Sequence, residues 1–374
     1  MIAPPLALSV VIPARNAAQT LPMSLAALAR SDLAREEWEV IVVDDASTDD
    51  TTAVARGLAD VVVELPTRRA LGPAYARNRG CDVARGEIIV FIDADVCVHR
   101  DTLRRFAELF RDDPTIGAAF GSYDAHPPAP GLISQYRNLL HHHVHQRNGG
   151  EAETFWAGCG AVRRSVFIDA DQFDEWHYPR PQIEDIELGA RIRALGHRIV
   201  LRPDIQATHL KRWTLGAVIR TDLFDRGVPW TRLLVQQRAA MRAKTLNLRR
   251  IERLKTVLAC VAVACAMLAW PMRDQRWLVT SVILLLVVIL ASADLYRRFA
   301  RVRGWPFALA TVPLQLLYYV INGVSVCMGW VVHHAVGEPR PDPVVEAYAE
   351  VGLVRDPPLP SRRRGGAWAE PASR

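Results

Sequence analysis

Two aspartates, Asp93 and Asp95, stand two residues apart directly after an apolar run in the stretch GEIIVFIDADV. Two carboxylates this close repel each other unless a positive charge lies between or beside them. A hard divalent cation such as Mg²⁺ or Mn²⁺ provides that charge, and in proteins it commonly joins one or two carboxylates to substrate phosphates. The spacing therefore predicts a metal site for a nucleoside diphosphate, with two solvated loop acids as the structural alternative.

A second group of polar residues has the types that bind a nucleotide. Asp44 follows the apolar run of WEVIVVDDAST and can accept a hydrogen bond from the imide N–H of a uracil. Arg77 and Asn78, in GPAYARNRG, can contact phosphate or ribose, and Gly72 lets the backbone approach a ligand closely. Each of these residues alone would be ordinary surface, but together they favour a binding site.

Residues further along the chain supply the remaining chemistry of a transferase. A hydroxyl acceptor that displaces a diphosphate needs one general base, and Asp185 is the candidate. Glu184 and Asp185 also open an expected helix, where a purely capping role is equally open. The glycine-rich turn after Phe155 and Trp156 suits an acceptor. His209 could ligate the metal as a neutral imidazole, although a lone histidine is more often structural.

The elements that must position these residues alternate between strands and helices. Short apolar runs predict strands near residues 6–13, 38–48, 60–66, 86–92 and 115–123, with helical stretches between them. This order predicts βαβ units and a mostly parallel sheet flanked by helices, an α/β fold. Ligands of such sheets lie beyond the carboxyl ends of the strands, where the acidic clusters fall. No GxGxxG follows the first strand and no GxxxxGK[ST] occurs, which argues against a Rossmann dinucleotide site and a P-loop.

The chain becomes strongly apolar after residue 255. About 20 apolar residues cross the hydrocarbon core of a membrane. Segments 255–272, 277–296 and 305–333 therefore predict about three transmembrane helices, the first with a buried core helix as its alternative. The basic residues around these segments predict a bacterial-type inner-membrane protein whose N-terminal domain lies in the cytoplasm. The side on which the tail lies is left open.

The segments outside the apolar region complete the predicted organisation. Arginines mixed with large apolar residues predict amphipathic helices at the membrane interface, with ordinary core helices as an even alternative. The C-terminal tail is rich in proline and charge and is predicted to be disordered. The predicted domains are an α/β domain over 1–213, interfacial helices over 214–254, a transmembrane segment over 255–336 and the tail over 337–374.

Composition excludes several other classes of protein. The net charge of +6 is accounted for by arginines beside the apolar segments, and no basic stripe with interleaved aromatic residues indicates a nucleic-acid partner. Six scattered cysteines without a C-x-x-C pair predict reduced thiols, and the N-terminus is a poor signal peptide. Four histidines between residues 141 and 145 could bind a metal, but a polar helix face is favoured.

Taken in order, these motifs resemble those of a family 2 glycosyltransferase with the GT-A fold. The resemblance covers roughly residues 7–235 and rests on VVIPARN, VIVVDDASTDDT, GPAYARNRG, FIDADV, FWAGCGA, IEDIELGARIRALG and HLKRW. It implies a metal-dependent, inverting, hexosyltransferase-type reaction that moves a sugar from a nucleotide-sugar in one displacement at the anomeric carbon. A C-terminal membrane segment resembles members that glycosylate lipid, polyprenyl-linked or cell-envelope acceptors.

The resemblance also implies roles for individual residues. Nucleotide contacts fall to Pro13, Arg15, Asn16, Asp44, Arg77 and Asp93; the metal ligands are Asp95 and His209; the base is Asp185; and the acceptor side holds Trp156, Gly158, Glu184, Arg212 and Trp213. Processive synthases carry Q-x-x-R-W, whereas HLKRW has no leading glutamine, so addition of one or a few sugars is favoured over polymerisation.

Three alternatives remain open at this level. A processive polysaccharide synthase is one, and a nucleotidyltransferase, which would release pyrophosphate, is another. A non-catalytic membrane scaffold is the third, although it would not need the acids at positions 93, 95 and 185. A UDP-sugar is the favoured donor, but a carboxylate at Asp44 could also read the N–H groups of guanine in a GDP-sugar.

Overall fold

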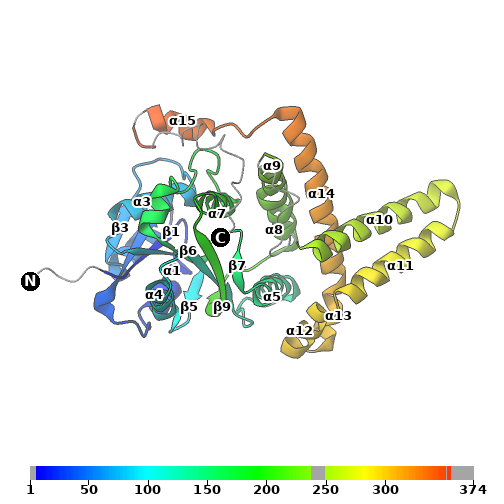
Figure 1. Cartoon of the computed structure of the whole chain (residues 1–374), viewed down its shortest axis with the longest axis horizontal. Helices are drawn as coiled ribbons and strands as arrows, with labels where there is room; N and C mark the ends of the chain where they lie inside the picture. The colour runs from blue at the N-terminus through cyan, green and yellow to red at the C-terminus, as the bar shows by residue number, and fades with distance from the viewer. Residues whose placement is uncertain (1–5, 237–248, 351, 355–374) are drawn as a thin grey trace, which may run out of the picture. The chain divides into compact units, whose positions relative to one another are not determined.

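The computed structural model describes residues 6–236, 249–350 and 352–354, which fall into two compact units (Figure 1). The first unit contains residues 1–124, 149–210 and 339–374. The second contains residues 125–148 and 211–338. Helix α5 (Leu132–Arg147) lies between the two longer stretches of the first unit in sequence. It nevertheless groups with the C-terminal helices rather than with the sheet.

The first half of the sheet in the first unit is parallel, as the alternating pattern predicts. Its strands run in the order β3-β2-β1-β4, and each is hydrogen-bonded in parallel with its neighbours. Apolar side chains on both faces explain why β1, β2 and β4 are buried along nearly their whole length. The bounds are β1 Leu8–Ala14, α1 Leu21–Leu28, β2 Trp38–Asp44, α2 Thr51–Leu58, β3 Val61–Glu64, α3 Pro73–Val83 and β4 Ile88–Ile92.

The second half of the sheet is mixed, so the prediction of a mostly parallel sheet needs correction. β8 lies beside β4 in the opposite direction, β6 pairs with β8 antiparallel and with β9 parallel, and β5 and β7 flank β9 antiparallel. β8 is only five residues long and glycine-containing, which is why its sequence reads as a turn. The bounds are β5 Val96–Val98, α4 Thr102–Asp112, β6 Ile116–Tyr123, β7 Gly150–Ala152, β8 Cys159–Arg163, α6 Arg164–Asp169, α7 Glu184–Ala194 and β9 Arg198–His209.

Part of the C-terminal tail is ordered against the first unit, contrary to the predicted disorder. Helix α15 (Pro343–Glu350) buries Val345, and the Tyr348 hydroxyl accepts a hydrogen bond from the Arg68 amide at 3.1 Å. Tyr75 donates its hydroxyl to the Leu353 carbonyl at 2.7 Å. A few apolar side chains and backbone bonds thus order a segment of polar composition. The predicted disorder of residues 355–374 lies outside the described residues.

The second unit is helical throughout its described residues. Tyr136 of α5 donates a hydrogen bond to Gln315 at 2.9 Å, and a cluster of apolar residues including Leu295 and Phe299 packs around it. The bounds are α8 Leu215–Arg220, a π-helical turn Thr221–Gly227, α9 Val228–Gln236, α10 Arg250–Met272, α11 Arg276–Ala291, α12 Ala293–Arg303, α13 Trp305–Ala310 and α14 Val312–Val336. The part of the predicted interfacial segment at 237–248 lies outside the described residues.

The apolar segments form candidate membrane spans with altered boundaries. Two stretches, Arg250–Met272 and Trp305–Val336, are long and apolar enough to cross a membrane. The predicted second span is split, because α11 ends at Ala291 and α12 continues at a bend of 59°. The structure thus contains two candidates, or three if the bent pair is one span, within the described residues.

Candidate active site

The carboxyl ends of β1 and β2 bring the first predicted residues together. Ala14 pairs with Asp44 in the parallel register, and the loop that follows β1 is held by Asn16, whose φ of 48° lies in the left-handed region. The Asn16 side-chain oxygen accepts a hydrogen bond from the Thr48 amide at 2.8 Å. Asn16 therefore shapes the loop after β2. Pro13 is half-buried within β1, and Arg15 is exposed beside it.

Asp44 is buried at this edge with one oxygen in use. Its Oδ2 accepts a hydrogen bond from the Ser47 amide at 3.3 Å. Its Oδ1 is buried and has no hydrogen-bond partner within the part of the chain that the structure describes. An unsatisfied buried acceptor costs free energy, so this oxygen is a place where a donor group of a ligand would be stabilised.

Asp45, to which the sequence analysis assigned no role, fixes the loop that precedes α3. Its two oxygens accept hydrogen bonds from the amides of Leu71 and Gly72 at 2.9 and 2.8 Å. Burial raises the pKa of Asp45, and these two amides oppose the rise. Gly72 has a φ of 90°, and a Cβ there would lie 2.4 Å from the Pro179 carbonyl oxygen. The sequence offered one signal for this role, because Asp45 is the second of two adjacent aspartates at the end of a predicted strand.

Arg77 is buried between two carboxylates. Its guanidinium lies 2.8 Å from Asp93 Oδ1 and 2.9 Å from Glu184 Oε1, and the side chain is 5% exposed. Burial alone would lower the pKa of Arg77, but Asp93 and Glu184 raise it, so the arginine stays charged. Burial raises the pKa of Asp93, and the neighbouring Arg77 opposes that rise. The positive charge beside Asp93 is therefore supplied by the protein itself.

Asp95 and His209 lie side by side at the ends of adjacent antiparallel strands. His209 Nε2 is 3.5 Å from Asp95 Oδ2, and the Leu210 amide donates a hydrogen bond to the Asp95 carbonyl at 2.9 Å. The ring of Tyr123 stacks on the His209 ring with centroids 4.3 Å apart, and Trp156 meets Tyr123 edge-on at 4.8 Å. Two predicted ligands thus meet, and an aromatic stack holds the imidazole.

The residues present fit a divalent metal that shares its ligands with a substrate. No group of three or more histidine, cysteine, aspartate or glutamate side chains is placed to hold an ion within the described ranges. One carboxylate and one imidazole remain, Asp95 and His209, since Asp93 is engaged by Arg77. Mg²⁺ and Mn²⁺ sites commonly have one or two protein ligands and take the others from phosphate and water. The donor set therefore suits a metal that is bound together with a diphosphate.

Asp185 is held in a defined orientation at the start of α7. Its Oδ2 accepts a hydrogen bond from the Ala157 amide at 3.1 Å, and its Oδ1 accepts one from its neighbour Ile186 at 2.8 Å. Glu184, in the same helical turn, accepts from the Gln182 amide as well as from Arg77. Asp185 also helps to raise the pKa of Arg77, so the two groups are close enough to interact electrostatically.

The glycine-rich turn links Asp185 to the Asp93–Asp95 segment. The Asp93 amide donates a hydrogen bond to the Gly158 carbonyl at 3.4 Å. A Cβ at Gly158 would lie 2.5 Å from the Trp156 ring, so the ring can lie over the backbone only where no side chain stands. The turn therefore places Trp156 next to both carboxylate-bearing segments.

Two predicted acceptor residues, Arg212 and Trp213, belong to the second unit. Trp213 is buried, and the Ser134 hydroxyl donates a hydrogen bond to its carbonyl and accepts one from its amide. Arg137 and Lys211 lie over its ring at 5.6 and 4.3 Å. Arg212 is exposed. Trp213 thus anchors the chain to α5, a role that the sequence did not indicate.

Comparison with known proteins identifies the domain that carries this site. Residues 9–170 match the family model described as Glycosyl transferase family 2. This stretch of the chain belongs to that family. The match spans Asp44, Arg77, Asp95 and Gly158, but it ends before Asp185 and His209.

The family 2 domain also has curated relatives. It is 33% identical over 99 residues to poly(ribitol-phosphate) beta-N-acetylglucosaminyltransferase TarS of Staphylococcus aureus, covering 26% of this chain and 17% of that protein. It is 41% identical over 101 residues to the succinoglycan biosynthesis protein ExoO of Rhizobium meliloti, covering 26% of this chain and 28% of that one. The aligned part is thus less than a third of each relative.

A solved structure shares the fold of this chain over most of its length. The mannosyltransferase PcManGT from Pyrobaculum calidifontis, in complex with GDP-Man and Mn²⁺, superposes with a TM-score of 0.51 at 21% identity. The superposition covers 87% of this chain and 90% of that one. The predicted GT-A fold is confirmed, with the mixed sheet described above.

Proposed function

We propose that the protein is an inverting, metal-dependent glycosyltransferase of the hexosyltransferase type. It transfers a sugar from a nucleoside-diphosphate-sugar to a hydroxyl of a lipid, polyprenyl-linked or cell-envelope acceptor. The observation that carries the proposal is the position of Asp185, whose carboxylate is held by the Ala157 amide in the same turn that is tied to Asp93. The proposed base, the two proposed metal ligands and the strand ends that would bind the nucleotide are then parts of one site.

The donor would lie along the carboxyl ends of β1 and β2. The unpaired Asp44 Oδ1 would accept from the imide N–H of a uracil, which favours a UDP-sugar and leaves a GDP-sugar as the alternative. Arg77 would act through Asp93 and Glu184 rather than through a direct phosphate contact, because both ends of its guanidinium are engaged. Pro13, Arg15 and Asn16 would border the nucleotide from the β1 side.

Asp95 and His209 would hold the divalent ion, Mn²⁺ or Mg²⁺. When bound, the ion supplies positive charge at the diphosphate as that group leaves. Tyr123 keeps the His209 ring in the plane that faces Asp95, since the two rings are nearly parallel with an angle of 6°. The ring nitrogen that binds the ion would be the one that carries no proton.

Asp185 would take the proton of the acceptor hydroxyl during the transfer. The acceptor oxygen forms its bond to the anomeric carbon while the bond from that carbon to the diphosphate breaks, and the configuration inverts. The proton ends on Asp185 and the electron pair on the nucleoside diphosphate. Trp156 and Gly158 would form the acceptor side with Glu184, while acceptor roles of Arg212 and Trp213 stay predictions from the sequence.

Relatives and composition support a membrane-bound, cell-envelope role. The printed names of the relatives refer to poly(ribitol-phosphate) and to succinoglycan. The arginines around the candidate spans support a position of the family 2 domain on the cytoplasmic face of a bacterial-type inner membrane. The missing leading glutamine in HLKRW disfavours processive polymerisation.

The test is a panel of nucleotide-sugars incubated with the purified chain, Mn²⁺ or Mg²⁺ and a membrane lipid extract, with products read by mass spectrometry. We expect free nucleoside diphosphate and a glycosylated product. Release of pyrophosphate would instead indicate a nucleotidyltransferase. Failure of every donor to give product or hydrolysis would favour the scaffold alternative.

The base assignment has its own test. Asp185→Asn should abolish turnover while leaving nucleotide binding within about twofold, since the amide keeps the size of the side chain but cannot take the proton. Asp112→Asn, at an exposed site on α4, is the matched control and should leave turnover unchanged. Equal activity of the two variants would remove Asp185 from the mechanism.

A further inference from the structure

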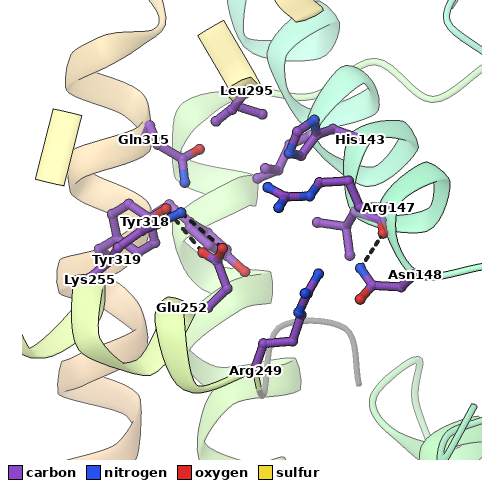
Figure 2. A pocket seen from close by; sticks show the side chains of 12 residues that line it. His143, Arg147, Asn148, Arg249, Glu252, Lys255, Leu295, Gln315, Tyr318 and Tyr319 are labelled. Carbon is purple, nitrogen blue, oxygen red and sulfur yellow. Dashed lines mark hydrogen bonds and ion pairs between the residues drawn. The ribbon is translucent and has the colours of Figure 1, made fainter. Parts of the chain in front are cut away.

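The second unit contains a cavity between α5, α10, α12 and α14 that plays no part in the proposed transfer (Figure 2). The cavity is partly open, and its empty volume is about 440 Å³ including solvent at its mouth. Its wall is mixed: Leu140 and Leu295 are apolar, whereas Arg147, Arg249 and Lys255 bring three cationic groups to one space. Figure 2 shows the Arg147 and Arg249 side chains extending into it from opposite elements.

Two of the three cations are already neutralised. Lys255 is buried and lies 2.9 Å from Glu252, whose other oxygen accepts a hydrogen bond from the Tyr319 hydroxyl at 3.2 Å. Arg147 forms an ion pair with Asp294 of α12. Arg249 has no ion-pair or side-chain hydrogen-bond partner among the residues that the structure describes, so the cavity carries one surplus positive charge.

A buried imidazole is also left over in the cavity. His143 is 7% exposed, and its Nδ1 has no partner in the described ranges. Burial lowers the pKa of His143 to about 4, against the nearby Asp294, so the ring is neutral at pH 7. A neutral ring carries one N–H, and a tautomer with that N–H on Nδ1 would present a donor without an acceptor. His143 Nε2 lies 3.8 Å from Asp294, so the Nδ1 of His143 and the guanidinium of Arg249 are the two groups that a ligand could engage.

The position of the cavity along the chain indicates where that ligand comes from. Seven basic and no acidic residues occur between Arg226 and Ile251, directly before the candidate span Arg250–Met272. Basic segments at the end of a span lie at the level of lipid headgroups and attract anionic lipids. The cavity lies at this end of α10, since Arg249, Glu252 and Lys255 line it.

We propose that this cavity binds the phosphate group of an anionic lipid, with Arg249 as the charged contact and His143 as a neutral donor. The site is independent of the transfer reaction, because the phosphate is held and no bond to it changes. Its effect is to fix the first turn of α10 at the membrane surface.

The proposal is tested by lipid binding to the full chain in uncharged detergent. Dioctanoyl phosphatidate carries phosphate on two acyl chains, dioctanoylglycerol has the chains alone, and inorganic phosphate has the anion alone. We expect saturable binding of phosphatidate, at least about tenfold weaker binding of phosphate and none of the glycerolipid. Equal binding of both lipids, or phosphate as tight as phosphatidate, would overturn the lipid assignment.

Two neighbouring arginines provide matched variants. Arg249→Gln removes the unpaired cation and should lower the affinity for phosphatidate about tenfold, which corresponds to one lost charge-assisted contact. Arg250→Gln changes the exposed neighbour outside the cavity and should leave affinity unchanged. Arg249→Lys keeps the charge and should retain most of the binding. An equal loss in Arg249→Gln and Arg250→Gln would show general attraction and contradict the site.

A second inference follows independently from the C-terminal segment. Residues 339–374 group with the first unit, and the contacts are specific: the Asp342 amide donates to the Trp176 carbonyl at 3.0 Å, and Val345 is 1% exposed. The chain thus leaves the first unit near residue 210 and returns to it near residue 339. A folded unit with polar loops does not straddle a bilayer. The intervening segment therefore crosses any membrane an even number of times.

Both candidate spans of the second unit expose apolar side chains. α10 and α11 lie side by side (Figure 1), and Trp270, Met267 and Leu290 on them are 90, 72 and 72% exposed. α14 packs against α9 and α10 but also exposes Val326, Trp330 and Val331 at 54, 54 and 55%. A Cβ at Gly323 would lie 2.2 Å from Cys260 of α10, and one at Gly329 would lie 2.6 Å from Thr231 of α9.

We infer that α10 crosses the membrane and that the chain crosses back once before residue 339. The family 2 domain and the C-terminal segment are then on one side, and residues 273–275 reach the other side. The inference has two crossings in place of the predicted three, and it puts the described C-terminal segment on the same side as the family 2 domain.

The topology is tested in a bacterial host with the eleventh strand of split green fluorescent protein as a tag. Tags at the N-terminus, after Arg374 and after Gln275 are inserted into the full chain, and the complementing fragment is expressed in the cytoplasm. We expect fluorescence in cells from both terminal tags and from the Gln275 tag only after detergent lysis. A tag after Arg374 that is silent until lysis, or a Gln275 tag that is bright in cells, would overturn the inference.

Discussion

The guanidinium of Arg77 joins Asp93 to Glu184 across 91 residues of sequence, with N···O distances of 2.8 and 2.9 Å. Asp93 begins the segment that leads to the proposed metal ligands, and Glu184 precedes the proposed base. One buried arginine thus ties together the two halves of the proposed site. The Arg77 guanidinium also lies over the Phe173 ring, 5.3 Å from the ring centroid, which shields it further from solvent.

Removing this arginine should destabilise the protein strongly. Arg77→Met leaves the buried Glu184 and the partly exposed Asp93 without a counter-charge, and breaking a buried pair such as Arg77–Glu184 costs about 3–5 kcal/mol. The free energy of unfolding, measured by denaturant titration in detergent, is the readout. Arg56→Met, in an exposed pair with Glu64, is the control and should cost less than about 1 kcal/mol.

A double variant separates charge from packing in this interaction. If the cost arises from stranded carboxylates, Arg77→Met with Glu184→Gln should recover part of the stability lost in Arg77→Met alone. Additive losses would instead mean that the arginine acts through its contacts with Phe173 and its surroundings.

Gly158→Ala should lower turnover with little effect on folding. The added Cβ would lie 2.5 Å from the Trp156 ring, which must then move against Tyr123, the ring that stacks on His209. A displacement of about 1 Å at a catalytic group can cost around 100-fold in rate, so we expect kcat to fall at least about tenfold. Gly57→Ala in α2, where nothing lies within 4 Å, should keep full activity and gain about 0.5–1 kcal/mol. Unchanged kcat in Gly158→Ala would show that the Trp156–Tyr123 stack does not position the site.

The sequence predicted the parts of the site that lie at strand ends. The apolar runs that end at Asp44 and Ile92 fix the strands, and parallel pairing brings their carboxyl ends to one edge whatever else the chain does. The proximity of Asp95 and His209 could also be predicted, because both are residue types that ligate metals.

The remaining features depend on long-range packing that leaves no local signal. Nothing near Arg77 indicates that Glu184 will reach it, and β8 enters beside β4 through five residues that read as a turn. The bend between α11 and α12 falls within a continuous apolar stretch, where hydropathy alone indicates one helix. Helix α15 forms from a polar tail because a few side chains find partners in the first unit.

Glu39 should make stability depend on acidity. Burial raises the pKa of Glu39, but hydrogen bonds from Ser9 and Arg85 lower it, and the net shift is downward from 4.5. A carboxyl with a depressed pKa in the folded state contributes stability that is present above 4.5 and is lost as the pH falls through the lower folded value. Glu39→Gln should therefore cost about 1–3 kcal/mol at pH 7 and flatten the decline of stability below pH 4.5.

The measurement for Glu39 is the free energy of unfolding as a function of pH. Glu36→Gln, at an exposed position in the neighbouring turn, is the control and should follow the wild-type curve. A Glu39→Gln curve that runs parallel to the wild-type curve at all pH values would show that the charge of Glu39 is not the source of the effect.

His209→Ala should lower the affinity for the metal strongly and change the fold little. The imidazole lies 3.5 Å from Asp95, so its loss leaves one protein ligand, and changes around a metal commonly cost 10–100-fold in affinity. We expect the half-saturating Mn²⁺ concentration for turnover to rise about tenfold or more, and chelation to abolish turnover in the unmodified chain. Mn²⁺ binding followed by electron paramagnetic resonance in the presence of UDP gives a readout that does not depend on activity. His126→Ala, at an exposed histidine outside the first unit, should bind Mn²⁺ as the unmodified chain does. If the two variants bind the ion equally, His209 is held by Tyr123 for structural reasons alone.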